Sequence, residues 1–187
     1  TLEPFEIKES AEFLEQNLGS FKVEAGLKDF IVHFTGGHPF YLGMIAAALA
    51  KPGASSLVDI LEELLFTYSG SLNQRFSSYL KRFHGISFSN DCITRLRLGA
   101  SGTNRIKDIA HLLRKTQKEL TQRINYLLEI DAISRNADFL SINDRVFGFW
   151  LKFVYQEKVN SLTFDSQNQR SLFRANIGNM IREFLGN

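Results

Sequence analysis

Cysteine is nearly absent from this chain of 187 residues, and long apolar runs are absent. The single Cys92 cannot form an internal disulfide, which fits a reducing compartment, and we interpret it as a small buried residue. No apolar run reaches transmembrane length, and the one at Ala46–Ala50 ends at Lys51-Pro52-Gly53. We therefore expect a soluble, cytoplasmic protein without a membrane partner. Because Thr1 is not an initiator methionine and no signal peptide follows it, we expect the chain to be part of a longer protein.

Recognisable catalytic chemistry is also missing. No Gly-x-x-x-x-Gly-Lys-Ser/Thr phosphate loop occurs, because the glycine-rich segment Gly99–Thr103 lacks both the lysine and the spacing. The four histidines follow no His-Glu-x-x-His or Cys/His pattern, and no pair of carboxylates can be given acid and base roles from spacing. We therefore expect that the chain alone is not an enzyme and has no metal, cofactor or catalytic residue.

Charge is distributed unevenly along the chain. Residues 1–69 hold four Lys/Arg against ten Asp/Glu, a net charge of −6, whereas residues 70–187 hold eighteen against ten, a net charge of +8. With a hydrophobic content of 44%, this indicates a folded protein whose two parts do different work. Within residues 86–145 the balance is only ten basic against seven acidic, so charge by itself does not establish nucleic-acid binding.

The hydrophobic pattern predicts a mainly α-helical chain. Over residues 1–69, apolar residues recur at helical spacing in four short segments separated by glycine and proline. The fourth segment begins near Ser56, and Asp59 three residues later completes a capping box. We expect these segments to form a small helical domain, which a helix over residues 70–85 connects to the next domain.

Residues 86–145 are typical of a winged helix-turn-helix domain. One helix is expected after Ser89-Asn90, a second over residues 105–115, and a third that the capping box at Thr116–Glu119 starts. Two β-prone pieces with a turn between them follow at residues 132–142. Three helices and then a hairpin make a winged helix with a two-stranded β-wing.

Residues 146–187 are expected to form C-terminal helices. Asp144 is placed to cap a helix with aromatic residues on two faces, which needs neighbours on both sides, and we interpret Trp150 as a core residue. The last helix, over residues 166–185, carries a looser apolar stripe, and its partner could lie beyond Asn187.

The most informative stretch runs from residue 36 to residue 42, Gly36-Gly37-His38-Pro39-Phe40-Tyr41-Leu42. Proline in a first helical turn gives up an amide that would be unpaired, and glycines before it allow backbone or ligand to approach closely. Exposed amides at such a helix start favour an anion such as phosphate. Glycine and proline are also ordinary loop residues, so the segment by itself favours a tight loop between two packed helices.

In sequence order, four segments resemble the C-terminal half of archaeal-type ATPases, which belong to the STAND branch of the AAA+ P-loop class. They are Leu2-Glu3-Pro4-Phe5, the segment at residues 36–42, Ile142-Asn143-Asp144 and Phe149-Trp150-Leu151, with the winged helix between the second and third. The resemblance covers nearly the whole chain. Its sharpest element is Gly-Gly-His-Pro followed by an aromatic or aliphatic run.

The resemblance implies a helical lid at residues 1–69 and an upstream core that binds ATP with Mg, so that the full-length protein would be an ATPase. By position, the turn that faces the nucleotide would consist of Gly36, Gly37, His38 and Pro39. Pro39 would lie near the adenine, and His38 near phosphate, where it could report the nucleotide state. No arginine near Gly36 matches the second sensor of many AAA+ lids, which argues against direct assistance to hydrolysis.

The expected function is a regulatory module, in which the lid senses nucleotide together with the core and the winged helix carries the change to DNA or a protein partner. One alternative is a stand-alone winged-helix DNA-binding regulator. Another is a module for protein interaction or homo-oligomerisation, for which the many aromatic residues of the segment 146–187 could provide a docking patch.

Candidates for DNA contact follow if residues 117–129 form the recognition helix. They are Lys115, Gln117, Lys118, Gln122, Arg123, Asn125 and Arg135. Amide side chains suit adenine edges, whereas lysine and arginine suit phosphates or guanine. The alternative is the solvated face of an amphipathic helix, and Glu119 and Glu129 would repel phosphates if they faced the groove.

Overall fold

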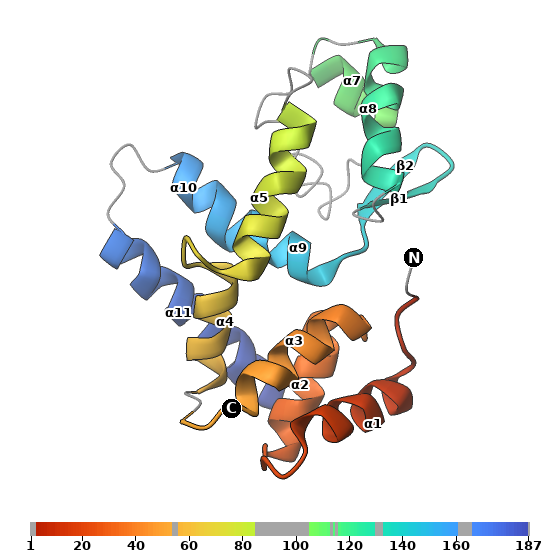
Figure 1. Cartoon of the computed structure of the whole chain (residues 1–187). Coiled ribbons are helices and arrows are strands. Elements are labelled where there is room, and N and C mark those ends of the chain that lie inside the picture. The colour runs from red at the N-terminus through yellow and green to blue at the C-terminus, as the bar shows by residue number, and fades with distance from the viewer. Residues whose placement is uncertain are drawn as a thin grey trace. The chain divides into compact units, whose positions relative to one another are not determined.

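The structure, a computed structural model, describes residues 3–53, 56–84, 105–112, 114, 116–129, 133–160 and 166–186 (Figure 1). The described part is mainly helical and contains one two-stranded antiparallel sheet, as the sequence predicted. The chain divides into two compact units. Unit 1 comprises Thr1–Asn73 and Thr163–Asn187, and unit 2 comprises Gln74–Leu162. The helix expected after Ser89-Asn90 lies outside the described residues, as does Cys92.

Unit 1 contains the four helices predicted near the N-terminus and one more from the C-terminus. They are α1 (Ile7–Leu18), α2 (Ala25–Thr35), α3 (Pro39–Leu49), α4 (Leu57–Leu65) and α11 (Ser166–Leu185). The capping box at the start of α4 is confirmed, because the Asp59 amide donates to Ser56 Oγ at 3.3 Å and the Ser56 amide donates to Asp59 Oδ2 at 3.0 Å. The apolar side of each helix faces a common core.

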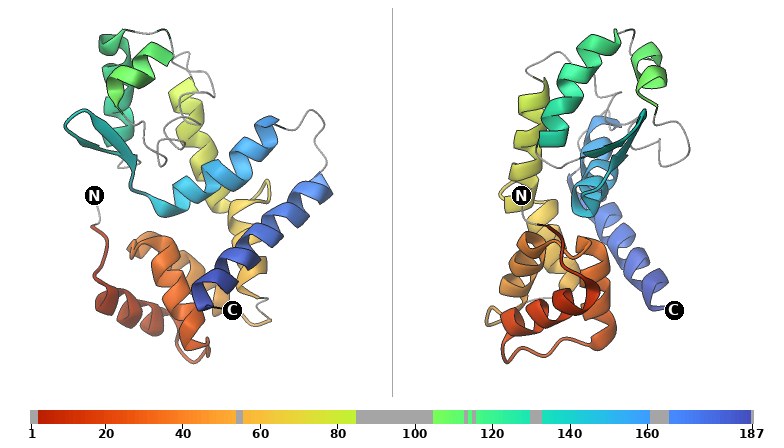
Figure 2. Two further views of the ribbon diagram at one scale, coloured as in Figure 1. Left: turned by 180° about the vertical axis from the view of Figure 1, so that it is seen from behind. Right: turned by 90° about the vertical axis from the view of Figure 1, so that its right-hand side faces the viewer.

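Helix α11 packs against α2 and α4 (Figures 1 and 2). Phe173 and Ile177 are completely buried, and the rings of Phe173 and Phe66 lie 5.4 Å apart. Near the end of α11 the ring of Phe184 contacts that of Phe30 edge to face, at 5.6 Å. Within the described residues, α2 and α4 are therefore partners of this helix.

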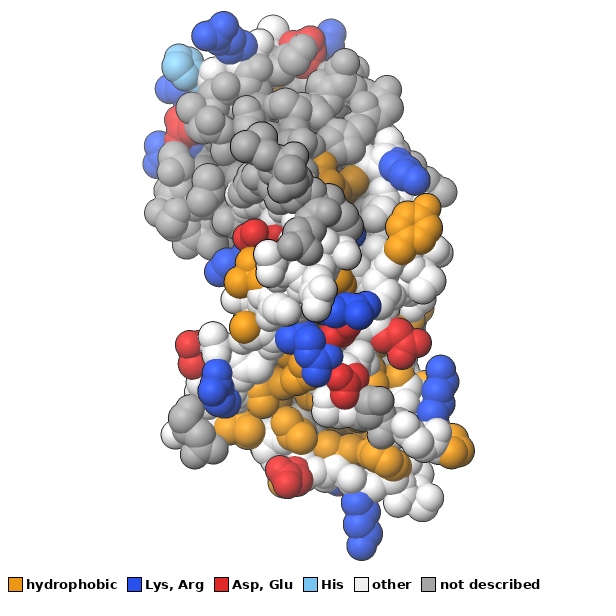
Figure 3. Space-filling model, turned by 90° about the vertical axis from the view of Figure 1, so that its left-hand side faces the viewer, with side chains coloured by type: hydrophobic (Ala, Val, Ile, Leu, Met, Phe, Trp, Pro, Cys, Tyr) orange, Lys and Arg blue, Asp and Glu red, His pale blue; other side chains and the backbone are white. Residues whose placement is uncertain are grey.

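Charged side chains join α11 to α4. Arg174 Nη1 lies 2.7 Å from Asp59 Oδ1 and also pairs with Glu62, while Arg170 Nε lies 2.8 Å from Glu62 Oε1. Hydrogen bonds from Ser56 and Arg174 lower the pKa of Asp59, and those to Glu62 and Asp59 raise the pKa of Arg174. The buried Glu62 carboxylate thus has two arginine partners, as a charge inside a packed interface requires. Figure 3 shows neighbouring basic and acidic side chains on one face of the molecule.

Unit 2 begins within α5 (Ser71–His84), the helix predicted at residues 70–85. Its further elements are α7 (Ile106–Leu112), α8 (Gln117–Glu129), β1 (Ile133–Asn136), β2 (Phe139–Ile142), α9 (Arg145–Trp150), the π-helical segment η2 (Leu151–Tyr155) and α10 (Gln156–Asn160). Strands β1 and β2 pair in antiparallel register around the turn at Ala137 and Asp138, as predicted.

Aromatic side chains form the core around α9. Trp150 is only 1% exposed, and its ring lies 5.6 Å from that of Phe76 and 6.2 Å from that of Phe147. Asp144 Oδ1 accepts a hydrogen bond from the Phe147 amide at 2.9 Å. The interpretation of Trp150 as core and of Asp144 as the helix cap is confirmed.

The predicted C-terminal extension over residues 146–187 is divided between the two units. Its first part, through α10, belongs to unit 2, whereas α11 belongs to unit 1. Unit 2 is consequently an insertion in unit 1, which the chain leaves within α5 and rejoins before α11. The physical reason is the burial of Phe173 and Ile177 in the core of unit 1.

Candidate functional site

The turn between α2 and α3, residues 36–39, brings together all four residues predicted to face a nucleotide. Gly36 ends α2 in the left-handed conformation at φ 62°, and Gly37 follows at φ 75°. Their amides donate to the carbonyl oxygens of His33 and Val32, both at 3.2 Å, which satisfies the last carbonyls of α2. Glycine is the residue that adopts two successive positive φ angles at little cost. The turn geometry therefore accounts for both glycines.

Gly37 also lies in close contact with the N-terminal segment of the chain. Its carbonyl oxygen accepts a hydrogen bond from the Phe5 amide at 2.9 Å. A Cβ atom at position 37 would lie 2.5 Å from the Phe5 oxygen and 2.9 Å from Ser10 Oγ. The close approach that glycine permits here is made by the chain itself.

His38 is the N-cap of α3, and Pro39 is its first residue. The Phe40 amide donates to His38 Nδ1 at 3.3 Å, so the helix cap uses Nδ1 and not Nε2. His38 is half-buried, and its ring lies 4.9 Å from that of Tyr41, whereas Pro39 is buried. One of the amides that would attract an anion at this helix start therefore already has a partner. The nucleotide-facing role of the turn stays a prediction.

A second candidate surface is formed by α7, α8 and the β1–β2 hairpin. The connection between the helices includes Arg114 at φ 51°, whose amide donates to the His111 oxygen at 3.2 Å. The predicted capping box at the start of α8 is confirmed: the Glu119 amide donates to Thr116 Oγ1 at 3.3 Å, and the Thr116 amide donates to Glu119 Oε2 at 3.0 Å. Leu120 of α8 is buried, and so are apolar residues of α7 and the hairpin, namely Ile106, Ile109, Ala110, Ile133 and Leu140.

Most of the predicted DNA-contact residues that the structure describes lie at the surface. Exposed are Gln117, Lys118 and Asn125 on α8 and Arg135 on β1. Gln122 and Arg123 belong to α8, but their side chains are not among those described, and Lys115 lies outside the described residues. Arg135 Nε donates to the Ala137 oxygen at 2.8 Å, so this guanidinium also supports the hairpin turn.

Of the two glutamates that could repel a phosphate, Glu119 is held at the cap. Its Oε2 accepts from the amide and the hydroxyl of Thr116, at 3.0 and 2.9 Å. Glu129 is exposed at the other end of α8. Between positions 105 and 142, the exposed basic side chains described are Arg105, Lys107, Arg114, Lys118 and Arg135, and the exposed acidic ones are Glu119, Glu129 and Asp138. The surface is therefore mildly basic.

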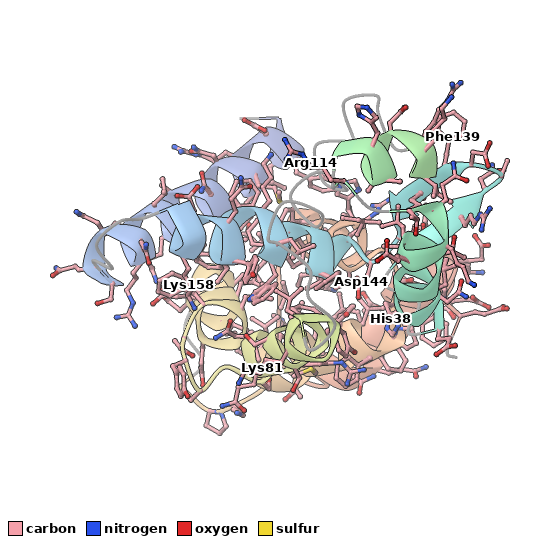
Figure 4. All side chains as sticks on the ribbon, turned by 90° about the horizontal axis from the view of Figure 1, so that it is seen from above. His38, Lys81, Arg114, Phe139, Asp144 and Lys158 are labelled. Atoms are coloured by element: carbon pink, nitrogen blue, oxygen red, sulfur yellow. The ribbon has the colours of Figure 1, made fainter. Side chains whose placement is uncertain are left out.

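Sequence reasoning missed two residues of this surface, Arg105 and Phe139. They are paired by an isolated antiparallel bridge, and the neighbouring Ile106 amide donates to the Asp138 oxygen at 2.9 Å. The Arg105 guanidinium carbon lies 5.1 Å from the centre of the Phe139 ring. Phe139 is nevertheless 45% exposed, where the hairpin meets the start of α7 (Figure 4). The alternation of β2, with buried Leu140 beside it, was the available signal.

The described residues also bear on metal binding and on membrane insertion. No three His, Cys, Asp or Glu side chains come together there in an arrangement that could hold a metal ion. No described helix combines the length and apolar character that a membrane span needs.

Comparison of the chain with protein-family models, with curated proteins and with solved structures gave no significant match.

Proposed function

We propose that α7, α8 and the hairpin are part of a winged helix that binds duplex DNA. The observation that carries the proposal is that Gln117, Lys118 and Asn125 are exposed on α8, the second helix of the pair, while Leu120 and Ile124 fix its other side in the core. An α-helix held in this way fits the major groove, where amide and ammonium groups can read base edges or bind phosphate. The exposed Arg135 of the hairpin adds a positive charge for the backbone.

A salt titration of binding to a blunt DNA duplex tests this function. Each phosphate contact adds about 0.9 to the negative slope of log affinity against log salt. We expect Lys118→Ala to weaken binding and to reduce the slope by about that amount. The matched control is Lys81→Ala, which removes the same charge from α5, apart from the hairpin (Figure 4), and should leave the slope unchanged.

A response of the wild-type chain that does not depend on salt, or equal losses in the two variants, would contradict DNA binding through α8. A protein partner, or a second copy of the chain, would then be the better explanation of the exposed surface. Light scattering of the chain distinguishes these two, because only self-association raises its mass.

A second candidate function concerns unit 1, and the observation that favours it is the hydrogen-bonded turn at residues 36–39, which places His38 at the start of α3. The hydrogen bond from the Phe5 amide to the Gly37 oxygen and the burial of Pro39 hold His38 in one place at a helix start. We propose that unit 1 acts as a lid on ATP and Mg bound by an upstream P-loop core, in a regulatory ATPase of the STAND class. With Nδ1 engaged in the cap, Nε2 is the ring atom that would donate to a phosphate oxygen.

The lid function is tested by joining the chain to its native upstream sequence and measuring ATP affinity. We expect His38→Ala and Pro39→Gly both to weaken ATP binding. His38→Asn is the control for the helix cap, because asparagine caps as well as any residue, whereas alanine costs about 1 kcal/mol of stability. Loss of affinity in both His38 variants supports a nucleotide contact. Normal affinity in His38→Asn reduces the role of His38 to capping, and normal affinity in all variants removes the lid function.

A further inference from the structure

We infer that Arg105 and Phe139 form a stacking site for an unpaired nucleobase, so that unit 2 prefers a duplex with a single-stranded end over a blunt duplex. The inference rests on the proposed DNA binding and names the form of DNA. It assigns the single-stranded part to the outer face of the hairpin, which we define by Ser134, Asn136, Phe139 and Ser141.

The backbone pairing puts these side chains on one face. Side chains alternate along a strand, and directly opposed residues of an antiparallel pair share a face. Phe139 is opposite Asn136 on one side and forms a bridge with Arg105 on the other, while its neighbour Leu140 points into the core. Arg105 and Phe139 are therefore cross-strand neighbours on the outer face, in agreement with the 5.1 Å between guanidinium and ring.

Packing does not bury Phe139. A phenylalanine is usually buried, yet 45% of its surface remains exposed although Arg105 lies over its ring. An exposed aromatic ring supported by a guanidinium is what single-stranded nucleic acid uses, because an unpaired base has a free face for stacking and a phosphate for the cation. Inside a duplex the bases stack on one another on both faces, so only unpaired or terminal bases offer a face to Phe139.

The surroundings of Phe139 fit the same ligand. Lys107 is exposed on the adjoining α7 and adds a second positive charge to that of Arg105, against one exposed carboxylate, Asp138. Along the outer face, Ser134 Oγ lies 2.7 Å from Ser141 Oγ and donates to Asn143 Oδ1 at 2.8 Å. These hydroxyl and amide groups can form hydrogen bonds with base edges of any sequence.

Fluorescence anisotropy of the full chain tests the inference, with one labelled duplex in three forms: blunt, with a 3′ single-stranded tail and with a 5′ tail. We expect one tailed form to bind about tenfold more tightly than the blunt form, in line with stacking of one base on an aromatic ring. Phe139→Ala should lose this gain and keep the blunt-duplex affinity, whereas Phe139→Trp should retain the gain. Phe21→Ala, at a phenylalanine of similar exposure in unit 1, is the matched control and should change nothing.

Equal affinity for all three forms, or a tail preference that survives in Phe139→Ala, overturns the inference and leaves duplex binding through α8 standing. If the wild-type chain binds none of the three forms, the proposed DNA binding fails as well. Thermal unfolding of the Phe139 variants identifies a purely structural role: loss of stability in Phe139→Ala without any change in tail preference assigns Phe139 to packing.

Discussion

Phe173→Ala is expected to lower the free energy of unfolding of unit 1 by about 3–5 kcal/mol, the usual cost of removing a large buried aromatic side chain. Phe173 is completely buried, and it contacts Phe66 from the C-terminal helix. Because a domain of this size is stabilised by only about 5–15 kcal/mol, the variant should lose much of its stability. Chemical denaturation followed by far-UV circular dichroism measures the change.

The neighbouring residue provides the control for this variant. Leu172 is 44% exposed on the same helix, so Leu172→Ala should cost no more than about 0.5 kcal/mol, as surface substitutions usually do. Hydrogen exchange locates the effect, since amide protection in Phe173→Ala should fall in α2 and α4 as well as in α11. Similar, small losses in both variants would mean that α11 does not complete the core of unit 1.

Gly37→Ala is expected to destabilise unit 1 by about 3 kcal/mol or more. Two costs add at this position: a left-handed φ of 75°, which is worth about 1 kcal/mol for a residue with a Cβ, and a clash of that Cβ with the Phe5 oxygen at 2.5 Å. The backbone on both sides is hydrogen-bonded and cannot move away without breaking the bond from the Phe5 amide. Denaturant unfolding of unit 1 measures the loss.

Gly53→Ala separates the two costs. Gly53 has nearly the same φ, 74°, but a Cβ there would meet no atom within 4 Å, so only about 1 kcal/mol should be lost. The difference between the two variants measures the close approach at Gly37. The single tryptophan, Trp150, belongs to unit 2, so its fluorescence follows the unfolding of that unit separately. Equal losses in the two variants would contradict the close packing of the turn against Phe5.

Local features of the fold could be read from the sequence. The capping residues Ser56, Thr116 and Asp144 all act as predicted, because a cap bonds within three residues of itself. The hairpin at 133–142 was equally predictable from the sequence, since two alternating segments flanked a short turn. The core position of Trp150 followed from the width of its apolar helix surface.

The candidate sites could be predicted only partly from the sequence. The exposed residues Gln117, Lys118 and Asn125 were found because helix periodicity identifies a polar face, and Arg135 was found as a charged residue of the expected wing. Phe139 was missed although the alternation of β2 indicated that it is exposed. Its pairing with Arg105 could not be predicted, because an isolated bridge between positions 34 residues apart leaves no local pattern. For the turn at residues 36–39, the sequence left a loop and a ligand site as alternatives. The structure explains both glycines by contacts within the chain.

By itself, then, the sequence determined the helices, their caps, the hairpin and the polar face of α8, since each depends on interactions between residues close together in the chain. Tertiary structure alone decided that α11 completes unit 1, that Glu62 pairs with arginines such as Arg174 112 positions away, and that Arg105 lies over Phe139. The physical reason is that burial and ion pairing depend on distance in space. Many segments of this chain carry an apolar stripe, and only packing selects which stripes meet.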